Sequence, residues 1–123
     1  MRNEGLAKTL IAEAAVAARR VVKFGASDTG VVQSAAAADF HIGVADLGAD
    51  SGDYCDVIVD GIALVEYGGN VTRGALLTAD AQGRAITATA AAGTNVRTIG
   101  VAMVSGVSGD IGSVRLAPGS FQG

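Results

Sequence analysis

Aromatic side chains are scarce in this sequence, and the shortage limits the core that it can form. Only three Phe and two Tyr occur among 123 residues, and Trp is absent. Half of the residues are hydrophobic, so Ala, Val, Ile and Leu must supply most of the core. A core of such small side chains has little volume per residue. We therefore expect one thin domain, or one that shares apolar surface with its neighbours.

Cysteine and histidine are also nearly absent, with Cys55 and His41 the only examples. A single Cys excludes a disulfide framework within the chain and favours a reducing compartment. Two N/S ligands are too few for a zinc site, which needs about four. No neighbouring base indicates an activated thiolate at Cys55. We expect Cys55 to be a small packing residue in a strand and His41 to be a surface or core-edge residue.

Motifs of catalysis and nucleotide binding are missing. The sequence has no phosphate-binding G-x-x-x-x-G-K-[ST], no G-x-G-x-x-G that opens a helix, and no G-x-S-x-G. The spacing of Asp53, Asp56 and Asp60 does not match a calcium-binding EF-hand loop, although a weak surface cation site is an alternative. We expect no enzymatic activity and no catalytic, cofactor-binding or metal-binding residues.

The net charge of −3 is unevenly distributed. Residues 1–23 carry five bases and two acids, giving +3, whereas residues 24–123 carry four bases and ten acids, giving −6. An acidic body without a basic stripe argues against nucleic-acid binding. The basic N-terminal segment predicts contact with an acidic partner such as another protein, and a solvated basic end is the alternative. We also expect no secretory signal and no membrane span.

Eighteen Gly and one Pro indicate many tight turns and short strands. Residues 6–18 have helix propensity, but we expect an extended arm or first strand there, because tertiary context overrides propensity. Asp60-Gly61 between apolar runs predicts a hairpin. Residues 34–39 and 88–95 are expected to be loops. The strand candidates are residues 21–24, 31–35, 42–45, 56–65, 76–78, 84–87, 99–104 and 113–117.

An internal repeat supports this all-β interpretation. Residues 42–57 (IGVADLGADSGDYCDV) match residues 99–114 (IGVAMVSGVSGDIGSV) without a gap, and eight of 16 positions are identical. The repeat predicts a small β-barrel or sandwich with an internal pseudo-duplication. Two copies are too few for a solenoid. We divide the chain into an N-terminal arm or first strand, residues 1–20, and a single β domain, residues 21–123.

The order of these segments resembles the capsid cement, or head decoration, family of tailed phages and prophages. The resemblance covers nearly the whole chain and rests on ARRVVKFG (18–25), IGVA (42–45), SGDYCDVIVDGIALVEYGG (51–69), VTRGALLTADAQGRA (71–85) and IGVAMVSGVSGDIGSVRLAPG (99–119). It implies a small β-barrel-like protein on the outer face of an icosahedral shell. It further implies that the protein is made in the bacterial host cytoplasm and binds junctions between major capsid subunits, most often as a homotrimer and sometimes as a dimer.

The resemblance and the charge asymmetry together give a functional hypothesis. The chain is expected to bind the major capsid protein and stabilise the expanded shell, without nucleic acid, membrane or small-molecule partners. A phage tail- or fibre-associated β module is the alternative, followed by a small-molecule-binding β-barrel. The capsid-contact residues that we predict are Arg2, Asn3, Leu6, Lys8, Arg19 and Arg20.

Overall fold

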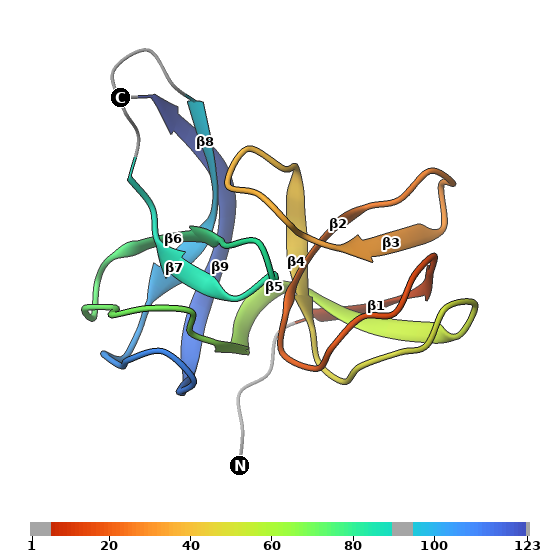
Figure 1. Cartoon of the computed structure of the whole chain (residues 1–123), viewed down its shortest axis with the longest axis horizontal. Coiled ribbons are helices and arrows are strands. Elements are labelled where there is room, and N and C mark those ends of the chain that lie inside the picture. Colours follow the sequence, from red (N-terminus) through yellow and green to blue (C-terminus); the bar gives the residue numbers. More distant parts are fainter. Residues whose placement is uncertain (1–5, 90–94, 123) are drawn as a thin grey trace.

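The computed structural model describes residues 6–89 and 95–122, and this part of the chain is all β-structure without a helix (Figure 1). The all-β prediction is therefore confirmed. The strands are β1 (Leu6–Ala12), β2 (Val21–Phe24), β3 (Gly30–Gln33), β4 (His41–Ala45), β5 (Tyr54–Glu66), β6 (Leu76–Ala79), β7 (Ala85–Thr87), β8 (Asn95–Ala102) and β9 (Ile111–Gln122).

The first half of the molecule, residues 6–60, is a closed five-stranded barrel. Its strand order is β1-β3-β2-β4-β5, and β5 pairs back onto β1 to close the ring. The β1–β3 pair is parallel and the other pairs are antiparallel. Closure leaves no open edge strand in this ring, which removes a site for unwanted strand pairing.

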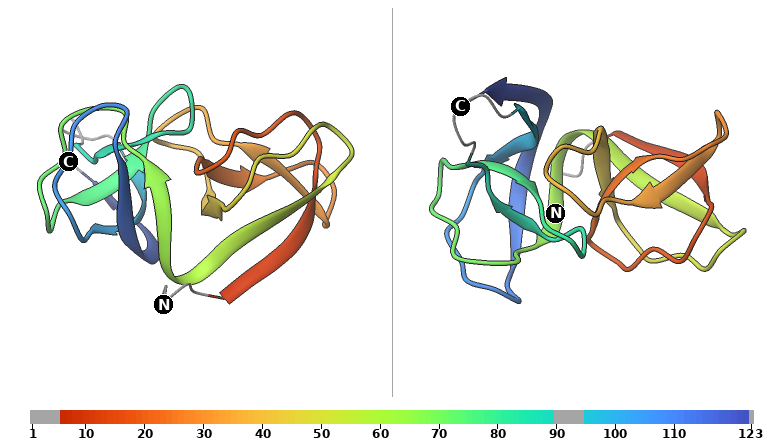
Figure 2. Two further views of the ribbon diagram at one scale, coloured as in Figure 1. Left: turned by 90° about the horizontal axis from the view of Figure 1, so that it is seen from below. Right: turned by 45° about the horizontal axis from the view of Figure 1, so that its top comes forward.

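The second half, residues 61–122, repeats this arrangement with β5, β9, β8, β6 and β7 in that order. Its strand pairs are antiparallel, and a single parallel bridge between Tyr67 and Ala85 corresponds to the parallel β1–β3 pair. Figure 2 shows the two halves side by side as two lobes of similar build.

Backbone hydrogen bonds establish that the two halves are equivalent. The amide of Ala12 donates to Asp53 O at 2.9 Å, and the amide of Tyr67 donates to Asp110 O at 2.8 Å. The isolated antiparallel bridge between Val16 and Ala49 is matched by the one between Val71 and Gly106. The offset is 55 residues between β2 and β6, 54 between β3 and β7, and 57 between β4 and β8. The predicted pseudo-duplication is thus confirmed and extends well beyond residues 42–57 and 99–114.

The hairpin predicted at Asp60-Gly61 is wrong, because β5 runs through this dipeptide without reversing. Residues 54–60 of β5 pair with β1 and β4, and residues 61–66 pair with β9. Gly61 has φ 88°, and Asp60 Oδ1 accepts its amide proton at 2.9 Å. The positive φ that would serve a tight turn instead bends one long strand as it passes between the halves (Figure 2).

Residues 6–12 form a strand, which supports the extended interpretation over the helical one. β1 is paired on both sides, with β3 and with β5, so its backbone bonds come from tertiary neighbours. Those partners override the Ala-rich helix propensity of this segment. The division of the chain at residue 20 stays a prediction.

The core has two clusters of buried side chains. One lies inside the first half and includes Val22, Val57 and Cys55, which is 1% exposed and confirms the packing role predicted for this thiol. The other fills the second half and also contains Val21 and Val44 from the first half. The apolar contact therefore continues across the seam, the boundary where the two halves pack together.

Candidate interaction surfaces

The residues predicted to contact a capsid lie in two separate places. Arg2 and Asn3 fall outside the described residues. Leu6, which is 67% exposed, and Lys8 are both exposed at the start of β1. Arg19 and Arg20 instead lie next to each other in the turn between β1 and β2 and reach the seam. The predicted contact residues that the structure describes therefore lie on two surfaces rather than on one arm. We call them the β1 face (Leu6 and Lys8) and the seam site (Arg19 and Arg20).

Arg20 joins the two halves through its guanidinium group. Its Nη1 donates to Gln82 O at 2.8 Å, and its Nη2 lies 3.4 Å from Glu66 Oε1. Gln33 supports the same point, because its Nε2 also donates to Gln82 O, at 2.7 Å. The seam site therefore rests on side chains that are far apart in the sequence, held by hydrogen bonds to a fixed turn.

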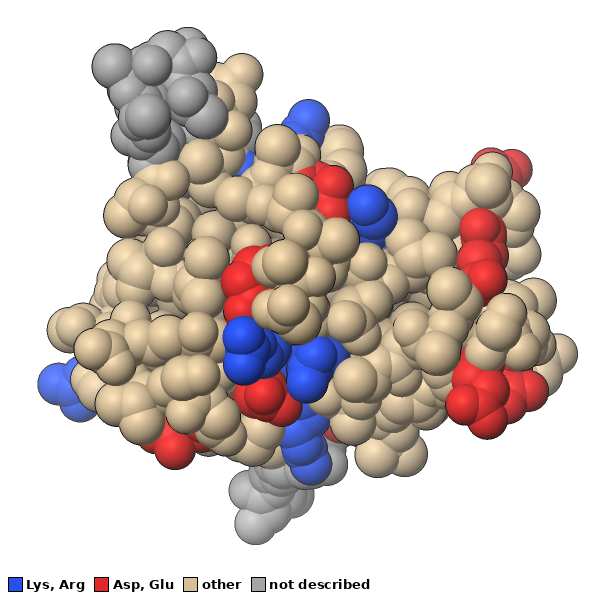
Figure 3. All heavy atoms as spheres, in the orientation of Figure 1, with Lys and Arg blue, Asp and Glu red and all other residues tan. Residues whose placement is uncertain are grey.

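Arg19 is held at the same site mainly by its backbone. Its amide donates to Ala45 O at 2.8 Å, and its carbonyl accepts from the amide of Glu66 at 2.9 Å. Its side chain is partly exposed, and Nη1 is buried without a hydrogen-bond partner among the described residues. Figure 3 shows basic groups gathered near the middle of the molecule, whereas acidic groups dominate the outer end of the first half.

Several acidic side chains stabilise turns by accepting hydrogen bonds from backbone amides. Glu13 accepts hydrogen bonds from the amides of Ser27 and Ala26, and these bonds lower the pKa of its carboxyl. Asp80 accepts from the amide and the Nε of Arg84 in the equivalent turn of the second half. These carboxylates act in local structure, although neither was singled out from the sequence.

Exposed apolar side chains recur at equivalent positions of the two halves. Leu47 and Tyr54 are 66% and 77% exposed, and Val104 and Ile111, which lie 57 residues further on, are 42% and 47% exposed. Large exposed apolar side chains are common features of protein contact surfaces. Neither pair was singled out from the sequence, although both pairs lie within the 57-residue repeat.

A second exposed group is aromatic. The rings of Phe24 and Phe40 lie 5.5 Å apart, and the Arg97 guanidinium lies 4.3 Å from the Phe40 ring centre. Both Phe side chains are more than half exposed. Aromatic and arginine side chains are enriched at protein interfaces, so this group is a further candidate contact.

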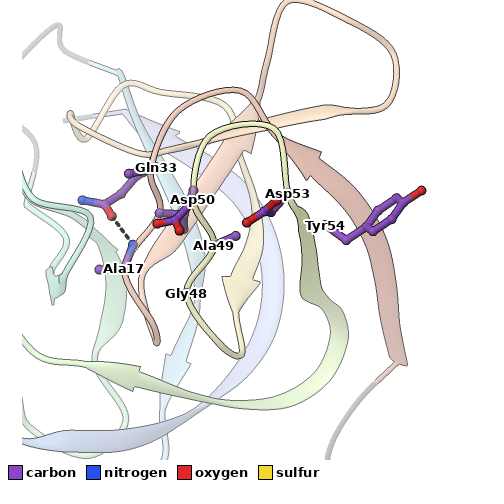
Figure 4. Close-up of a pocket in the computed structure, with 9 residues that line it drawn as sticks. Ala17, Gln33, Gly48, Ala49, Asp50, Asp53 and Tyr54 are labelled. Atoms are coloured by element: carbon purple, nitrogen blue, oxygen red, sulfur yellow. Dashed lines mark hydrogen bonds between the residues drawn. The ribbon is translucent and has the colours of Figure 1, made fainter.

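An open hollow of about 560 Å³ lies on the first half between the loop that follows β1, the end of β3 and the loop before β5 (Figure 4). Asp50 and Asp53 contribute its charged groups, and the amide of Ala17 donates to Gln33 Oε1 across it at 3.0 Å. Figure 4 shows the Tyr54 ring turned away from the hollow. The lining is open and rich in small residues, and it offers no paired nucleophile and base. Residues 6–89 and 95–122 also contain no group of three or more His, Cys, Asp or Glu that could hold a metal ion.

Ser34 and His41 form a hydroxyl–imidazole contact of 2.9 Å, but its surroundings are structural. Both residues are buried, and the other ring nitrogen of His41 lies 3.3 Å from Thr78 Oγ1 instead of meeting a carboxylate. Burial lowers the pKa of His41, which keeps the ring neutral. The surface position considered for His41 is therefore wrong, and its ring links the first half to the second.

Comparisons with known proteins point in one direction. The family model described as phage cement protein matches residues 2–117. Among solved structures, the chain is similar to the N base of the head fiber gp8.5 in bacteriophage phi29, with 20% identity and a TM-score of 0.69. The similarity covers 91% of this chain and 93% of that one. No curated protein matches the chain. Within the described residues, no helix is long and apolar enough to cross a membrane.

Proposed function

The chain belongs to the phage cement protein family, and from this premise we propose that it binds the outer surface of an icosahedral capsid at junctions between major capsid subunits and stabilises the expanded shell. The observation that carries the proposal is the family match, which spans residues 2–117 and thus nearly the whole chain. The structural role at the capsid follows from the family. The junction, the partner and the stabilising effect are the proposed part.

The likeness to a head fiber base supports attachment to a phage head, because that protein has the same fold across most of both chains. The surface of the present structure is consistent with such a role. It displays apolar side chains in both halves and basic side chains on the β1 face and at the seam. These features suit protein contact, whereas polar, enclosed cavities would suit a small substrate.

Stabilisation would follow from mass action. A protein that binds the assembled shell and not its separated subunits lowers the free energy of the assembled state as its concentration rises above the dissociation constant. A homotrimer, with a dimer as the alternative, would add avidity because its later contacts form within one complex. Sedimentation at micromolar concentration tests this point, and a monomeric mass would contradict the proposed oligomer.

The basic residues predicted from the sequence give the proposal an electrostatic part. We propose that Arg2, Asn3, Leu6, Lys8, Arg19 and Arg20 contact an acidic region of the shell. Charge reversal at Arg2 and Lys8 should reduce capsid occupancy, and the reduction should shrink as salt increases. Unchanged occupancy at physiological salt would remove the N-terminal hook from the proposal.

Co-sedimentation with empty capsids is the direct test. The purified chain is mixed with expanded shells and with unexpanded shells, and bound protein and shell melting temperature are measured. We expect binding to expanded shells and an increase in their melting temperature that depends on the concentration of the chain. Equal binding to both shell forms would contradict the specificity for the expanded state. Absence of binding would contradict the proposed function.

A fibre-associated β module is the second candidate, and the head fiber similarity is the observation that favours it. The two roles differ in stoichiometry. A cement protein occupies many repeated positions on the shell, whereas a tail-associated module occupies few. Counting copies per particle by quantitative mass spectrometry separates these outcomes.

A further inference from the structure

Arg19 has a backbone conformation that the fold favours for glycine. Its φ is 59°, and it is the only non-glycine residue with positive φ among the described residues. The equivalent residue of the second half is Gly74, with φ 94°. The two turns match in their bonds, since Arg19 N donates to Ala45 O and Gly74 N donates to Ala102 O. A β-carbon in this region is strained, so the arginine is unfavourable for the turn itself.

The side chain does not recover this cost inside the described molecule. Arg19 Nη1 and Arg20 Nε are both buried and lack hydrogen-bond partners among the described residues. In residues 6–89 and 95–122, the one carboxylate paired with this site is Glu66, which lies 3.4 Å from Arg20 Nη2. Among the described residues, no carboxylate forms an ion pair with the Arg19 guanidinium, so its charge is not matched there. A partly desolvated arginine without a matching anion is destabilising.

We propose that Arg19, supported by Arg20, is the docking point for a carboxylate side chain of the capsid protein. This inference rests on the proposed function and deepens it by naming the residue and the chemistry of the contact. A guanidinium group offers a planar set of donors that matches a carboxylate, and the excess positive charge at the seam complements it. The backbone hydrogen bonds of Arg19 with Ala45 and Glu66 hold the base of its side chain in place.

A polyanion such as nucleic acid fits this site less well than a single carboxylate. Glu66 lies within the site and would repel an extended row of phosphates. The Arg84–Asp80 ion pair in the neighbouring turn is already neutralised. No basic stripe with interleaved aromatic side chains surrounds Arg19 among the described residues. The charge complementarity is therefore local and favours one acidic side chain.

The test replaces Arg19 by the residue of the equivalent turn. Arg19→Gly removes the strain and the buried donor together, so we expect the isolated chain to melt about 2–6 °C higher. We expect the same variant to bind expanded empty capsids at least about tenfold more weakly at physiological salt. Arg73→Gln is the matched control, because Arg73 is an exposed base in the equivalent turn and its loss removes the same charge.

The outcomes separate this inference from the proposed function. If the unchanged chain does not bind capsids, the proposed function fails. If it binds and Arg19→Gly binds equally well, or if Arg73→Gln weakens binding as much, only the docking role of Arg19 is overturned. A lower melting temperature for Arg19→Gly would also overturn it, because the side chain would then stabilise the fold itself. Binding of both chains to double-stranded DNA is measured in parallel. If Arg19→Gly loses binding to DNA but keeps its binding to capsids, the ligand of Arg19 is a phosphate and the carboxylate is rejected.

Discussion

The two halves of this molecule share a hydrogen-bonding scheme but fill their interiors with different side chains. Ala12 in the first half corresponds to Tyr67 in the second, and Tyr67 is fully buried. Its ring lies against Gly112 and Gly106, where the first half has Cys55 and Ala49. One large side chain that faces two glycines thus takes the place of three small side chains. The comparison teaches that backbone pairing defines this fold, whereas core volume can be redistributed among equivalent positions.

The halves also differ in how they fix their turns. Glu13 reaches from another segment to hold the turn at residues 25–30, whereas Asp80 holds its own turn at residues 80–84. His41 in β4 corresponds to Thr98 in β8, and both are buried. The equivalent positions thus tolerate a titratable group in one half and a neutral hydroxyl in the other.

The largest effect on stability that distinguishes the two halves is expected for Tyr67→Ala. Removing the buried ring would leave a cavity against Gly112 and Gly106 and lower the free energy of unfolding by about 3–5 kcal/mol. Adding Gly112→Cys, the pairing used by Ala12 and Cys55, should restore part of that loss. Urea unfolding of the single and double variants measures both effects. Tyr67→Phe is the control for the hydroxyl bond to Val104 O, at about 1 kcal/mol.

Equal losses from Tyr67→Ala with and without Gly112→Cys would contradict the idea that the two halves solve the same packing problem. A positive coupling energy in this double-mutant cycle would support it.

A second comparison uses two glycines that lie 57 residues apart in strands β4 and β8. A β-carbon at Gly43 would meet Ile58 O, and one at Gly100 would meet Arg115 O. Both contacts are with backbone, which cannot easily move away. Gly43→Ala and Gly100→Ala should each lower the free energy of unfolding by about 1–3 kcal/mol, measured by thermal unfolding. Gly69→Ala is the control, because its β-carbon would make one ordinary contact, with the Ile86 side chain.

Gly52→Ala and Gly109→Ala should lower the free energy of unfolding by a smaller amount, and by nearly the same amount as each other. Their φ values are 91° and 92°, and a β-carbon at either would meet no atom within 4 Å. Only backbone strain should therefore act, at about 1–2 kcal/mol for each Gly→Ala change. Denaturant titration of the two variants should give matching losses. A clear difference between them would show that the turns are less equivalent than their bonds indicate.

The smallest effect should be the pH dependence that His41 gives to the first half. Burial lowers the pKa of His41 in the folded chain, so its contribution to stability is present above the unfolded pKa of about 6.5 and is lost as pH falls. His41→Thr, which introduces the residue found at position 98, should reduce the loss of stability between about pH 8 and about pH 5.5. Urea unfolding at both pH values checks this. An unchanged pH slope would exclude His41 as its source.

Asp39 does not obscure this test. Burial acts to raise the pKa of Asp39, but hydrogen bonds from the Ala35 amide and Lys23 outweigh it and keep the pKa below its usual value. Its stabilising contribution is therefore lost at lower pH than that of His41.

Much of the fold could be predicted from the sequence because local sequence patterns determine it. The 57-residue repeat predicted the duplication, and alternating β-branched runs predicted most strands. The continuous path of β5 through Asp60-Gly61 could not be predicted from the sequence. Asp60-Gly61 has the composition of a hairpin turn, and only pairing with β9, some 50 residues away, shows that the chain bends and continues.

The candidate site was predictable only in part. Charge singled out Arg19 and Arg20, but not their place at the seam, because Arg20 meets Gln82 and Glu66 at separations of 62 and 46 residues. The strain at Arg19 was also hidden, since nothing in the run AARRVV signals a positive φ. Leu47 and Tyr54 could have been found by asking which apolar residues recur in the repeat.

The continuous strand β5 has a mechanical consequence. Because residues 54–60 belong to the first half and residues 61–66 to the second, the two lobes share one covalent strand instead of a flexible tether. A force that separates the two lobes acts along the backbone of β5 and on the hydrogen bonds that join β5 to β1, β4 and β9. Many hydrogen bonds therefore resist this force together. Separation of the two lobes would therefore require the ladders of β5 to break, since no flexible linker joins residues 60 and 61.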